Sequence, residues 1–218
     1  MINKILHFGF FGGQKPSALN KRCFESWRRV LPDWEFMEWN DTNSPDTPWF
    51  RQAVKQRPVN ASNYLRVWAL WKYGGVYLDN DMELLKAPDT SLKYFTGWQT
   101  DDAKLASVNC AAIGSSKGHQ LNFECMRRIS QMPPDCDPTA PAPVLFTDIL
   151  RAYGLRMDGT EQTVCGITVY AKEVLYPWAW FEKPDRSRIT DRTIGVHWWS
   201  GSWAPHLRHP NAADQFAG

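Results

Sequence analysis

The chain has 218 residues, of which 43% are hydrophobic, and it carries 25 basic and 23 acidic side chains. This size suits one core and is too small for two ordinary domains with a linker, so we expect a single domain over residues 1–218. The balanced charge lacks the basic surface that binds nucleic acid, and no apolar run approaches the roughly 20 residues that span a membrane.

The N-terminal residues and the cysteines bear on where the protein works. Residues 1–7 lack the apolar stretch and the small-residue cleavage site of a secretory signal, which predicts a cytoplasmic protein. Peripheral association with the inner face of the membrane stays open. The five cysteines are widely spaced and include no Cys-x-x-Cys pair, so we expect reduced thiols.

The first expected elements are a strand, a helix and a second strand. Residues 3–8 predict a strand, and a glycine-rich turn over residues 9–13 follows it. This turn lacks the Gly-x-Gly-x-x-Gly pattern of dinucleotide sites, which argues against a dehydrogenase. Apolar spacing predicts a helix over residues 17–30, and alternation predicts an edge or half-buried strand over residues 34–39.

A second helix is predicted over residues 61–73, where one face is mostly apolar and belongs in a core. Asn60 is the expected N-cap, and the glycine pair at 74–75 is expected to end the helix. Asn63 and Arg66 lie three residues apart and therefore share a face, off the apolar stripe.

Two acidic residues, Asp79 and Asp81, follow the short apolar run 76–78. This run predicts a buried strand that delivers both acids at its carboxyl end, where ligands bind in open α/β sheets. An unpaired buried charge costs several kcal/mol, and a divalent cation would compensate both carboxylates. Oxygen ligands favour magnesium or manganese. The plainer alternative is a solvated turn, because Asp-x-Asp is short and common.

The rest of the chain alternates strands and helices and ends in a tryptophan-rich stretch. Most of the 12 tryptophans are expected in the core, although some could stack on sugar rings. A segment rich in proline is expected to be a mobile loop over the site. The expected elements are strands over residues 82–85, 107–113 and 166–170, helices over 120–129 and 144–153, and this loop over 132–143.

The residues around the two acids resemble the signature of the Asp-x-Asp sugar transferases, of the capsular polysaccharide and outer-chain α-mannosyltransferase type. The large glucosylating toxins are a more distant resemblance. Asn63 departs from the pattern, which has aspartate there. Further landmarks at residues 3–13, 114–119, 174–181 and 195–203 follow the order of the family. The matching signature positions are Ser62, Arg66, Gly74, Gly75, Tyr77, Leu78, Asp79 and Asp81.

The resemblance implies an α/β fold of the GT-A type: a mostly parallel, Rossmann-like sheet between helices, with a small antiparallel piece after the acids. It also implies a metal-dependent hexosyltransferase that uses a UDP- or GDP-sugar. The acceptor would be a glycan or lipid-linked glycan in polysaccharide or lipopolysaccharide synthesis, and the anomeric configuration would be retained. A metal-dependent nucleotide-sugar hydrolase and a catalytically silent sugar-binding protein are the alternatives.

The same resemblance implies roles for individual residues. The catalytic residues would be Asp79, Asp81 and Arg66, and the ligands of manganese or magnesium would be Asp79, Asp81 and His197. Residues that contact the donor would be His7, Phe8, Gly9, Phe10, Asn63, Arg66, Asn80, Ser202 and Trp203. The plainer alternatives are ordinary core positions for Phe10 and His197 and a surface ion pair for Arg66.

Overall fold

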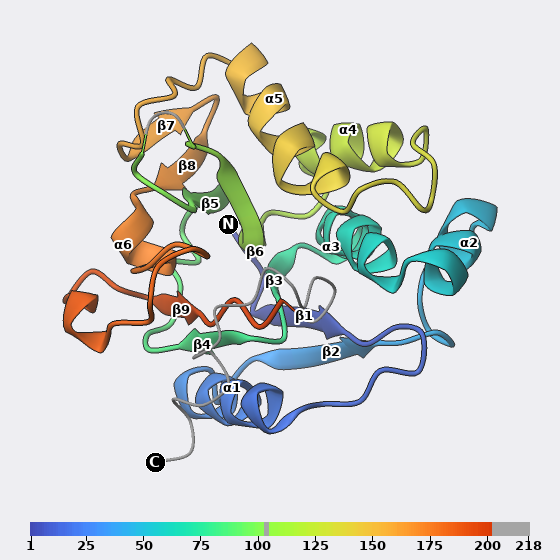
Figure 1. Ribbon diagram of the computed structural model, residues 1–218, viewed down its shortest axis with the longest axis horizontal. Coiled ribbons are helices and arrows are strands. Elements are labelled where there is room, and N and C mark those ends of the chain that lie inside the picture. The colour runs from blue at the N-terminus through green and yellow to red at the C-terminus, as the bar shows by residue number, and fades with distance from the viewer. Residues whose placement is uncertain (103–104, 202–218) are drawn as a thin grey trace.

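The computed structural model describes residues 1–102 and 105–201, which form a seven-stranded sheet with helices on both faces (Figure 1). The strand order is β2-β1-β3-β6-β5-β8-β7. β2, β1, β3, β5 and β8 run in one direction, and β6 and β7 run in the other. The predicted α/β class with a mostly parallel sheet is confirmed. The strands are β1 Ile5–Gly9, β2 Glu35–Trp39, β3 Gly75–Leu78, β5 Tyr94–Trp98, β6 Val108–Ser115, β7 Gln162–Val164 and β8 Ile167–Tyr170.

A separate two-stranded antiparallel sheet follows the acids, as predicted. It pairs β4 (Met82–Leu84) with β9 (Gly195–His197), and Met82 lies opposite His197. Two strands that are far apart in the sequence therefore lie side by side at the site (Figure 1).

The helices form two layers around the sheet. α2 to α5 pack on one face, where they share one cluster of buried side chains, whereas α1, α6 and the small sheet pack on the other. The helices are α1 Ala18–Val30, α2 Pro48–Gln56, α3 Pro58–Tyr73, α4 Gln120–Ile129, α5 Leu145–Ala152 and α6 Lys172–Leu175, with helical turns η1 Ala140–Val144 and η2 Arg186–Arg188. No helix within the described ranges has the length and apolar character needed to cross a membrane.

α1 fixes the small sheet. Ser17 caps this helix in a capping box with Asn20, which explains why it begins at Ala18. Trp27 Nε1 donates to the Met82 carbonyl at 2.6 Å, and the Ser26 hydroxyl accepts from the Leu84 N–H at 2.9 Å. These buried bonds hold β4 in place directly after the acids.

The central helix α3 differs from the prediction at its start. It begins at Pro58, so Asn60 is not the N-cap but a fully buried residue inside the helix. Burial is not confined to one face, because α3 lies between the sheet and the neighbouring helices α2 and α4. A single apolar stripe was therefore the wrong expectation for this helix.

The end of α3 is as predicted and depends on two glycines. Gly74 and Gly75 both have positive φ, at 69° and 107°, a region that side chains disfavour. A Cβ on Gly75 would lie 2.4 Å from the carbonyl oxygen of Ile5. Glycine at this position therefore lets β3 enter the sheet directly beside β1.

Several elements were not predicted, among them β5, α2, β7 and α6. β5 is buried along its whole length, so it lacks the alternation of a half-exposed strand. α2, β7 and α6 are short, and short elements carry little periodic signal. Residues 132–139 of the predicted loop 132–143 are a loop, whereas residues 140–143 belong to the helical turn η1.

His7 at the centre of β1 predicts a pH dependence of stability. It is fully buried, its Nε2 lies 2.8 Å from the Gly74 carbonyl, and its Nδ1 accepts from Trp39 Nε1 at 3.2 Å. These partners suit a neutral ring with the proton on Nε2. Burial lowers the pKa of His7 to about 4, although the bond to Gly74 opposes the shift.

Because the unfolded histidine titrates near pH 6.5, the unfolded state binds this proton first as the pH falls. We expect the free energy of unfolding contributed by His7 to be complete above pH 6.5 and to fall by about 3 kcal/mol toward pH 4. Urea unfolding of the wild type and of His7→Gln across this range measures the difference. Parallel pH profiles for the two proteins would contradict the expectation.

Candidate functional site

The turn that carries the acids is held from three sides. The Asp79 N–H donates to the Ala111 carbonyl on β6 at 2.7 Å. Asn80 Nδ2 donates to the Gly9 carbonyl at the end of β1 at 2.8 Å, and its own carbonyl accepts from Asn20 Nδ2 on α1 at 2.9 Å. The turn is therefore a fixed part of the fold rather than a solvated loop.

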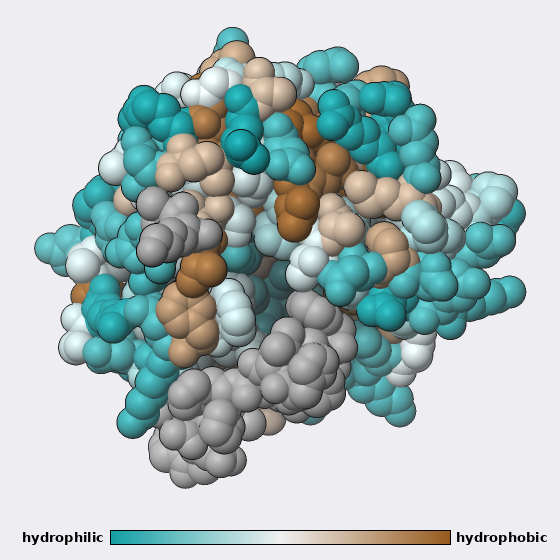
Figure 2. Space-filling view, turned by 45° about the horizontal axis from the view of Figure 1, so that its top comes forward, coloured by the Kyte–Doolittle hydropathy of each residue, from teal (hydrophilic) through white to brown (hydrophobic). Residues whose placement is uncertain are grey.

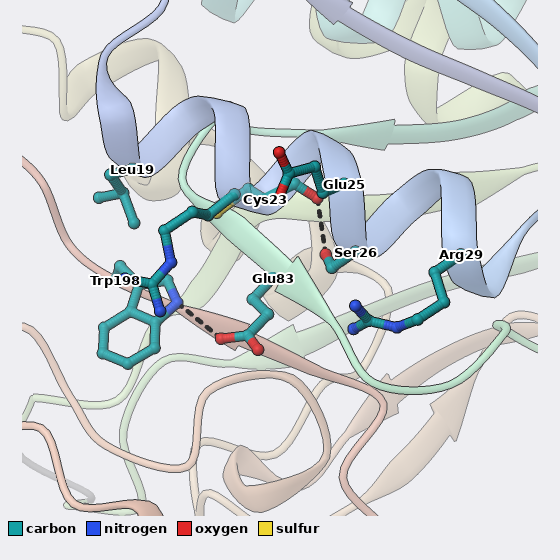
Figure 3. Close-up of a pocket in the computed structure, with 8 residues that line it drawn as sticks. Leu19, Cys23, Glu25, Ser26, Arg29, Glu83 and Trp198 are labelled. Carbon is teal, nitrogen blue, oxygen red and sulfur yellow. Dashed lines mark hydrogen bonds between the residues drawn. The ribbon is translucent and has the colours of Figure 1, made fainter. Parts of the chain in front are cut away.

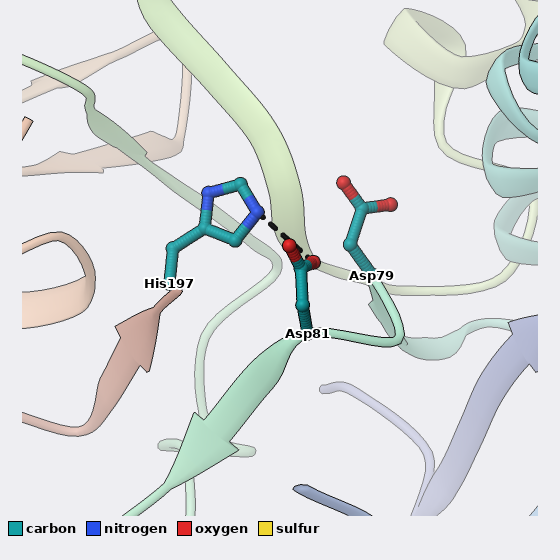
Figure 4. Close-up of side chains that lie close together, drawn as sticks. All are labelled: Asp79, Asp81 and His197. Carbon is teal, nitrogen blue, oxygen red and sulfur yellow. Dashed lines mark hydrogen bonds and ion pairs between the residues drawn. The ribbon is translucent and has the colours of Figure 1, made fainter. Parts of the chain in front are cut away.

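Asp79, Asp81 and His197 form a cluster whose potential ligand atoms all lie within 4.8 Å of one another. Figure 4 shows the two carboxylates side by side and the imidazole facing Asp81. Asp79 follows β3, Asp81 precedes β4, and His197 ends β9, so the pairing of β4 with β9 brings the three together. The resemblance implied a position of His197 beside the acids, and His197 lies there.

Asp81 is buried and receives three groups. His197 Nε2 lies 3.1 Å from its Oδ1, and the Ser200 N–H donates to its Oδ2 at 2.8 Å. The Trp198 N–H donates to its backbone carbonyl at 3.0 Å. Burial alone would raise the pKa of Asp81, but the charge of His197 and the hydrogen bonds from His197 and Ser200 outweigh it and hold the pKa well below its usual range.

The backbone at Trp199 is left-handed, with a φ of 49°, although this residue is not glycine. The Trp199 ring lies 4.0 Å from the His197 ring between centroids. Trp199 Nε1 also donates to the Trp178 carbonyl at 3.0 Å. In this conformation the Ser200 N–H reaches Asp81 and the indole packs on the imidazole.

Arg66 reaches the same cluster from α3. It is 4% exposed, and its Nη2 lies 3.2 Å from Asp79 Oδ1, while its Nη1 donates to the Cys110 carbonyl at 2.5 Å. The guanidinium also lies over the Tyr77 ring, 4.9 Å from the centroid. Burial alone would lower the pKa of Arg66, but Asp79 raises it, so the group stays charged. The alternative of a surface ion pair is wrong, because Arg66 is buried and Asp79 is half-buried.

Arg66 and His197 bear on the inference that a metal compensates the two acids. We inferred a metal because two buried acids need compensation, yet Arg66 and His197 already supply part of it. The donor set still fits a divalent ion, since it offers two carboxylates and one imidazole. In the part of the chain that the structure describes, the buried Asn80 Oδ1 has no hydrogen-bond partner, which leaves an acceptor oxygen unused in the turn that carries the acids.

Asn63 lies under the proline-rich segment. It is 3% exposed, and its Nδ2 donates to the Pro138 carbonyl at 3.1 Å. The predicted contact of Asn63 with the donor sugar stays a prediction. Sequence spacing placed Asn63 and Arg66 on one helical face correctly, but it could not show that the loop covers the first of them.

The residues predicted to hold the donor base are largely buried. Both nitrogens of His7 are bonded inside the protein, and its predicted contact with the donor stays a prediction. Phe8 packs on Phe24, and the edge of the Phe10 ring also meets Phe24. Phe10 is 8% exposed, and base contact by Phe8, Gly9 and Phe10 stays a prediction. Ser202 and Trp203 lie outside the described residues.

A group that sequence reasoning missed lies next to the cluster. Glu83 on β4 accepts from Trp198 Nε1 and from Arg186, each at 3.1 Å. It also lines a pocket of about 150 Å³ between α1 and the small sheet (Figure 3). This network holds the chain that follows His197 against β4. The pocket is lined by Leu19, Arg22, Cys23, Glu25, Ser26, Arg29, Glu83 and Trp198.

The surface is hollowed near the middle of the face in Figure 2, with apolar surface along part of the rim. Small-molecule sites in proteins are concave, so a hollow of this kind is a candidate for ligand binding.

The comparison with protein families finds one match. Residues 17–97 match the model of the "Glycosyltransferase sugar-binding region containing DXD motif". The matched region contains Asp79, Asp81 and Arg66, and it confirms the resemblance stated from the sequence.

Curated relatives and solved structures agree with this match. The chain is 27% identical over 138 residues to inositol phosphoceramide mannosyltransferase 3 of Schizosaccharomyces pombe, covering 59% of this chain and 37% of the relative. It is 26% identical over 149 residues to human lactosylceramide 4-alpha-galactosyltransferase, covering 64% and 41%. The chain thus spans less than half the length of these two relatives.

Two solved glycosyltransferases share the fold. PaToxG glycosyltransferase superposes with a TM-score of 0.50 at 18% identity, covering 69% of each chain. A glycosyltransferase involved in glycosylation of the major capsid of PBCV-1 superposes with a TM-score of 0.51 at 12% identity, covering 88% of this chain and 92% of that one. These likenesses show the fold, and the predicted glycosyltransferase architecture is confirmed.

The geometry around Arg66 predicts that lysine cannot replace it. A lysine keeps the charge but lacks the planar fork that reaches Asp79 and the Cys110 carbonyl together. We expect Arg66→Lys to lower the free energy of unfolding by about 1–3 kcal/mol and to weaken metal binding. Arg151→Lys, in an exposed pair with Asp148, is the matched control. Equal urea midpoints for both variants would contradict this role of Arg66.

Proposed function

We propose that this chain, which carries the sugar-binding region of the DXD glycosyltransferases, transfers a hexose from a UDP- or GDP-sugar to a hydroxyl of a glycan or glycolipid. Manganese or magnesium would be the cofactor. The observation that carries the proposal is the cluster of Asp79, Asp81 and His197 at the carboxyl end of β3. The ceramide-linked names of the curated relatives support a lipid-linked acceptor over a free polysaccharide.

Each residue of the cluster has a distinct task in this proposal. A divalent ion held by Asp79, Asp81 and His197 would compensate the charge of the diphosphate leaving group. Arg66 fixes the position of the Asp79 carboxylate. The Ser200 N–H holds Asp81, and the Trp199 ring packs on His197, so the ligand set is arranged before the ion arrives.

We assign the acceptor proton to the departing phosphate rather than to a side chain. Asp79 and Asp81 are engaged by Arg66 and His197, so neither is free to serve as a dedicated base. The alpha linkage in the name of the galactosyltransferase relative supports retention, because common nucleotide-hexose donors are themselves alpha-configured. One large sheet, with a two-stranded sheet packed beside it, supports one domain. Location in the cytoplasm or at a membrane face stays part of the proposal.

Binding of the leaving group with its metal is the first test. At a concentration 100 times its Kd, a ligand that binds the folded state adds about 2.7 kcal/mol of stability. We expect UDP or GDP with manganese to raise the melting temperature, and EDTA to abolish the rise. If no nucleoside diphosphate shifts the melting temperature, the nucleotide-sugar hypothesis fails.

Asp81→Asn tests the metal site without removing the shape of the side chain. The amide oxygen can still accept from the Ser200 N–H, and the amide nitrogen can donate to a neutral His197, so we expect a folded protein. Turnover of the nucleotide sugar should fall by at least ~100-fold, the scale of losing one key electrostatic group.

The matched control is Asp148→Asn, an exposed aspartate on α5. Release of nucleoside diphosphate with and without added lactosylceramide, which is a glycolipid, separates a transferase from a hydrolase. Full turnover by Asp81→Asn would eliminate the metal site at these residues.

A further inference from the structure

Two buried asparagines on α3 face the proline-rich segment of residues 132–144. Asn60 Nδ2 donates to the carbonyls of Pro134 and Cys136, each at 2.9 Å. Asn63 Nδ2 donates to the Pro138 carbonyl at 3.1 Å and lies 3.5 Å from Asn60 Oδ1. The two amides thus present donors to three carbonyls of one loop.

The chemistry of this contact requires amides. The partners on the segment are carbonyl oxygens, which only accept, so the side chain on α3 must donate. An ionised aspartate at position 63 has no donor, and it would place a negative charge against the Pro138 carbonyl. Asn60 and Asn63 are 0% and 3% exposed, so water cannot replace the lost bonds without a local opening.

Further contacts fix the two ends of the 132–144 segment. Trp49 Nε1 on α2 donates to the Met132 carbonyl at 2.7 Å. At the other end, the Thr147 hydroxyl donates to the Pro143 carbonyl at 3.0 Å and accepts from the Val108 N–H on β6 at 2.9 Å. In Figure 1 the yellow-green chain between α4 and α5 accordingly passes along α3.

The segment lies next to the residues that hold the acids. Asn63 precedes Arg66 by three residues, which places the two side chains one helical turn apart on the same face. Arg66 reaches both Asp79 and the Cys110 carbonyl on β6, while the end of the segment is bonded to β6 through Thr147. The same two elements, α3 and β6, therefore hold the segment and the Arg66–Asp79 pair.

We propose that Asn60 and Asn63 form an amide clamp that fixes the 132–144 segment beside the Arg66–Asp79 pair, where the clamped segment limits which donor sugar can bind. The role in selectivity rests on the proposed function. Both asparagines are positioning residues, since they act through the segment and not by touching the sugar. A clamped segment gives a rigid wall, and a rigid wall discriminates between sugars that differ in one hydroxyl.

Hydrogen exchange tests the clamp directly. The loss of one net hydrogen bond raises the equilibrium constant for local opening about fivefold. Asn63→Asp should therefore raise the amide hydrogen-exchange rates of residues 135–144 by at least about fivefold. Asn63→Ala removes the bond without burying a charge and decides the question if the aspartate variant does not fold.

Asn122→Asp is the matched control. Asn122 is also fully buried, but its partners are the hydroxyls of Tyr94 and Ser115, and the serine hydroxyl can turn to donate to a carboxylate. We expect Asn122→Asp to leave exchange over residues 135–144 unchanged. Equal exchange over these residues in the wild type and in both Asn63 variants would overturn the clamp.

Selectivity is measured by thermal shift with a panel of UDP- and GDP-sugars and manganese. We expect the Asn63 variants to bind the nucleotide sugar that the wild type prefers more weakly. The ratio of its affinity to the affinities of the other nucleotide sugars should fall, while the affinity for the bare nucleoside diphosphate should not change. A loosened segment with unchanged relative affinities would overturn the role in selectivity. If the wild type binds no nucleotide sugar, the proposed function and the selectivity role both fail, while the exchange result still decides the clamp.

Discussion

The site depends on the compensation of two carboxylates that stand one residue apart. Asp79 is paired with Arg66 from the helix that precedes the strand, and Asp81 is held by His197 and the Ser200 N–H from the last described strand and the turn after it. Each partner comes from a different element, so the positions of these elements are constrained together. Gly75, which lets β3 lie close to β1, and the hydrogen bonds from α1 to β4 help to fix these positions.

This arrangement explains how Asp81 can be buried with Asp79 half-buried beside it. An isolated pair of carboxylates would lose several kcal/mol in desolvation, and here a guanidinium, an imidazole and backbone N–H groups offset that cost. These groups do not use all the ligand atoms of the cluster. The atoms of Asp79, Asp81 and His197 that could bind a cation face one another, so an added positive charge meets an existing set of ligands.

The sequence predicted those parts of the site that lie close together along the chain. The buried strand Gly75–Leu78, the turn after it and the two acids follow from local apolar pattern and glycine chemistry. The partner of Arg66 could not be predicted this way, because a helical pattern gives the face of a residue and not the element that meets it. The left-handed backbone at Trp199 could not be predicted either, since positive φ is unusual for tryptophan.

The central helix shows a second limit of sequence reasoning. A helix surrounded by a sheet and other helices has polar residues in buried positions, and their partners are chosen by the tertiary structure. The residue type and position of Asn60 predict an N-cap, yet its amide donates hydrogen bonds to carbonyls 74 and 76 residues away. Buried amides of this kind become visible only when the loop that they bind is in place.

The pairing of β4 with β9 has a consequence for how the protein is made. Asp81 and His197 are separated by 116 positions, so a ribosome adding about 5–20 residues per second makes the histidine roughly ten seconds after the aspartate. During that interval the two acids have Arg66 as a partner but lack His197 and the Ser200 N–H. All seven strands of the large sheet have been synthesised before β9, so the pairing of β4 with β9 is the last strand pairing of the described residues that can form.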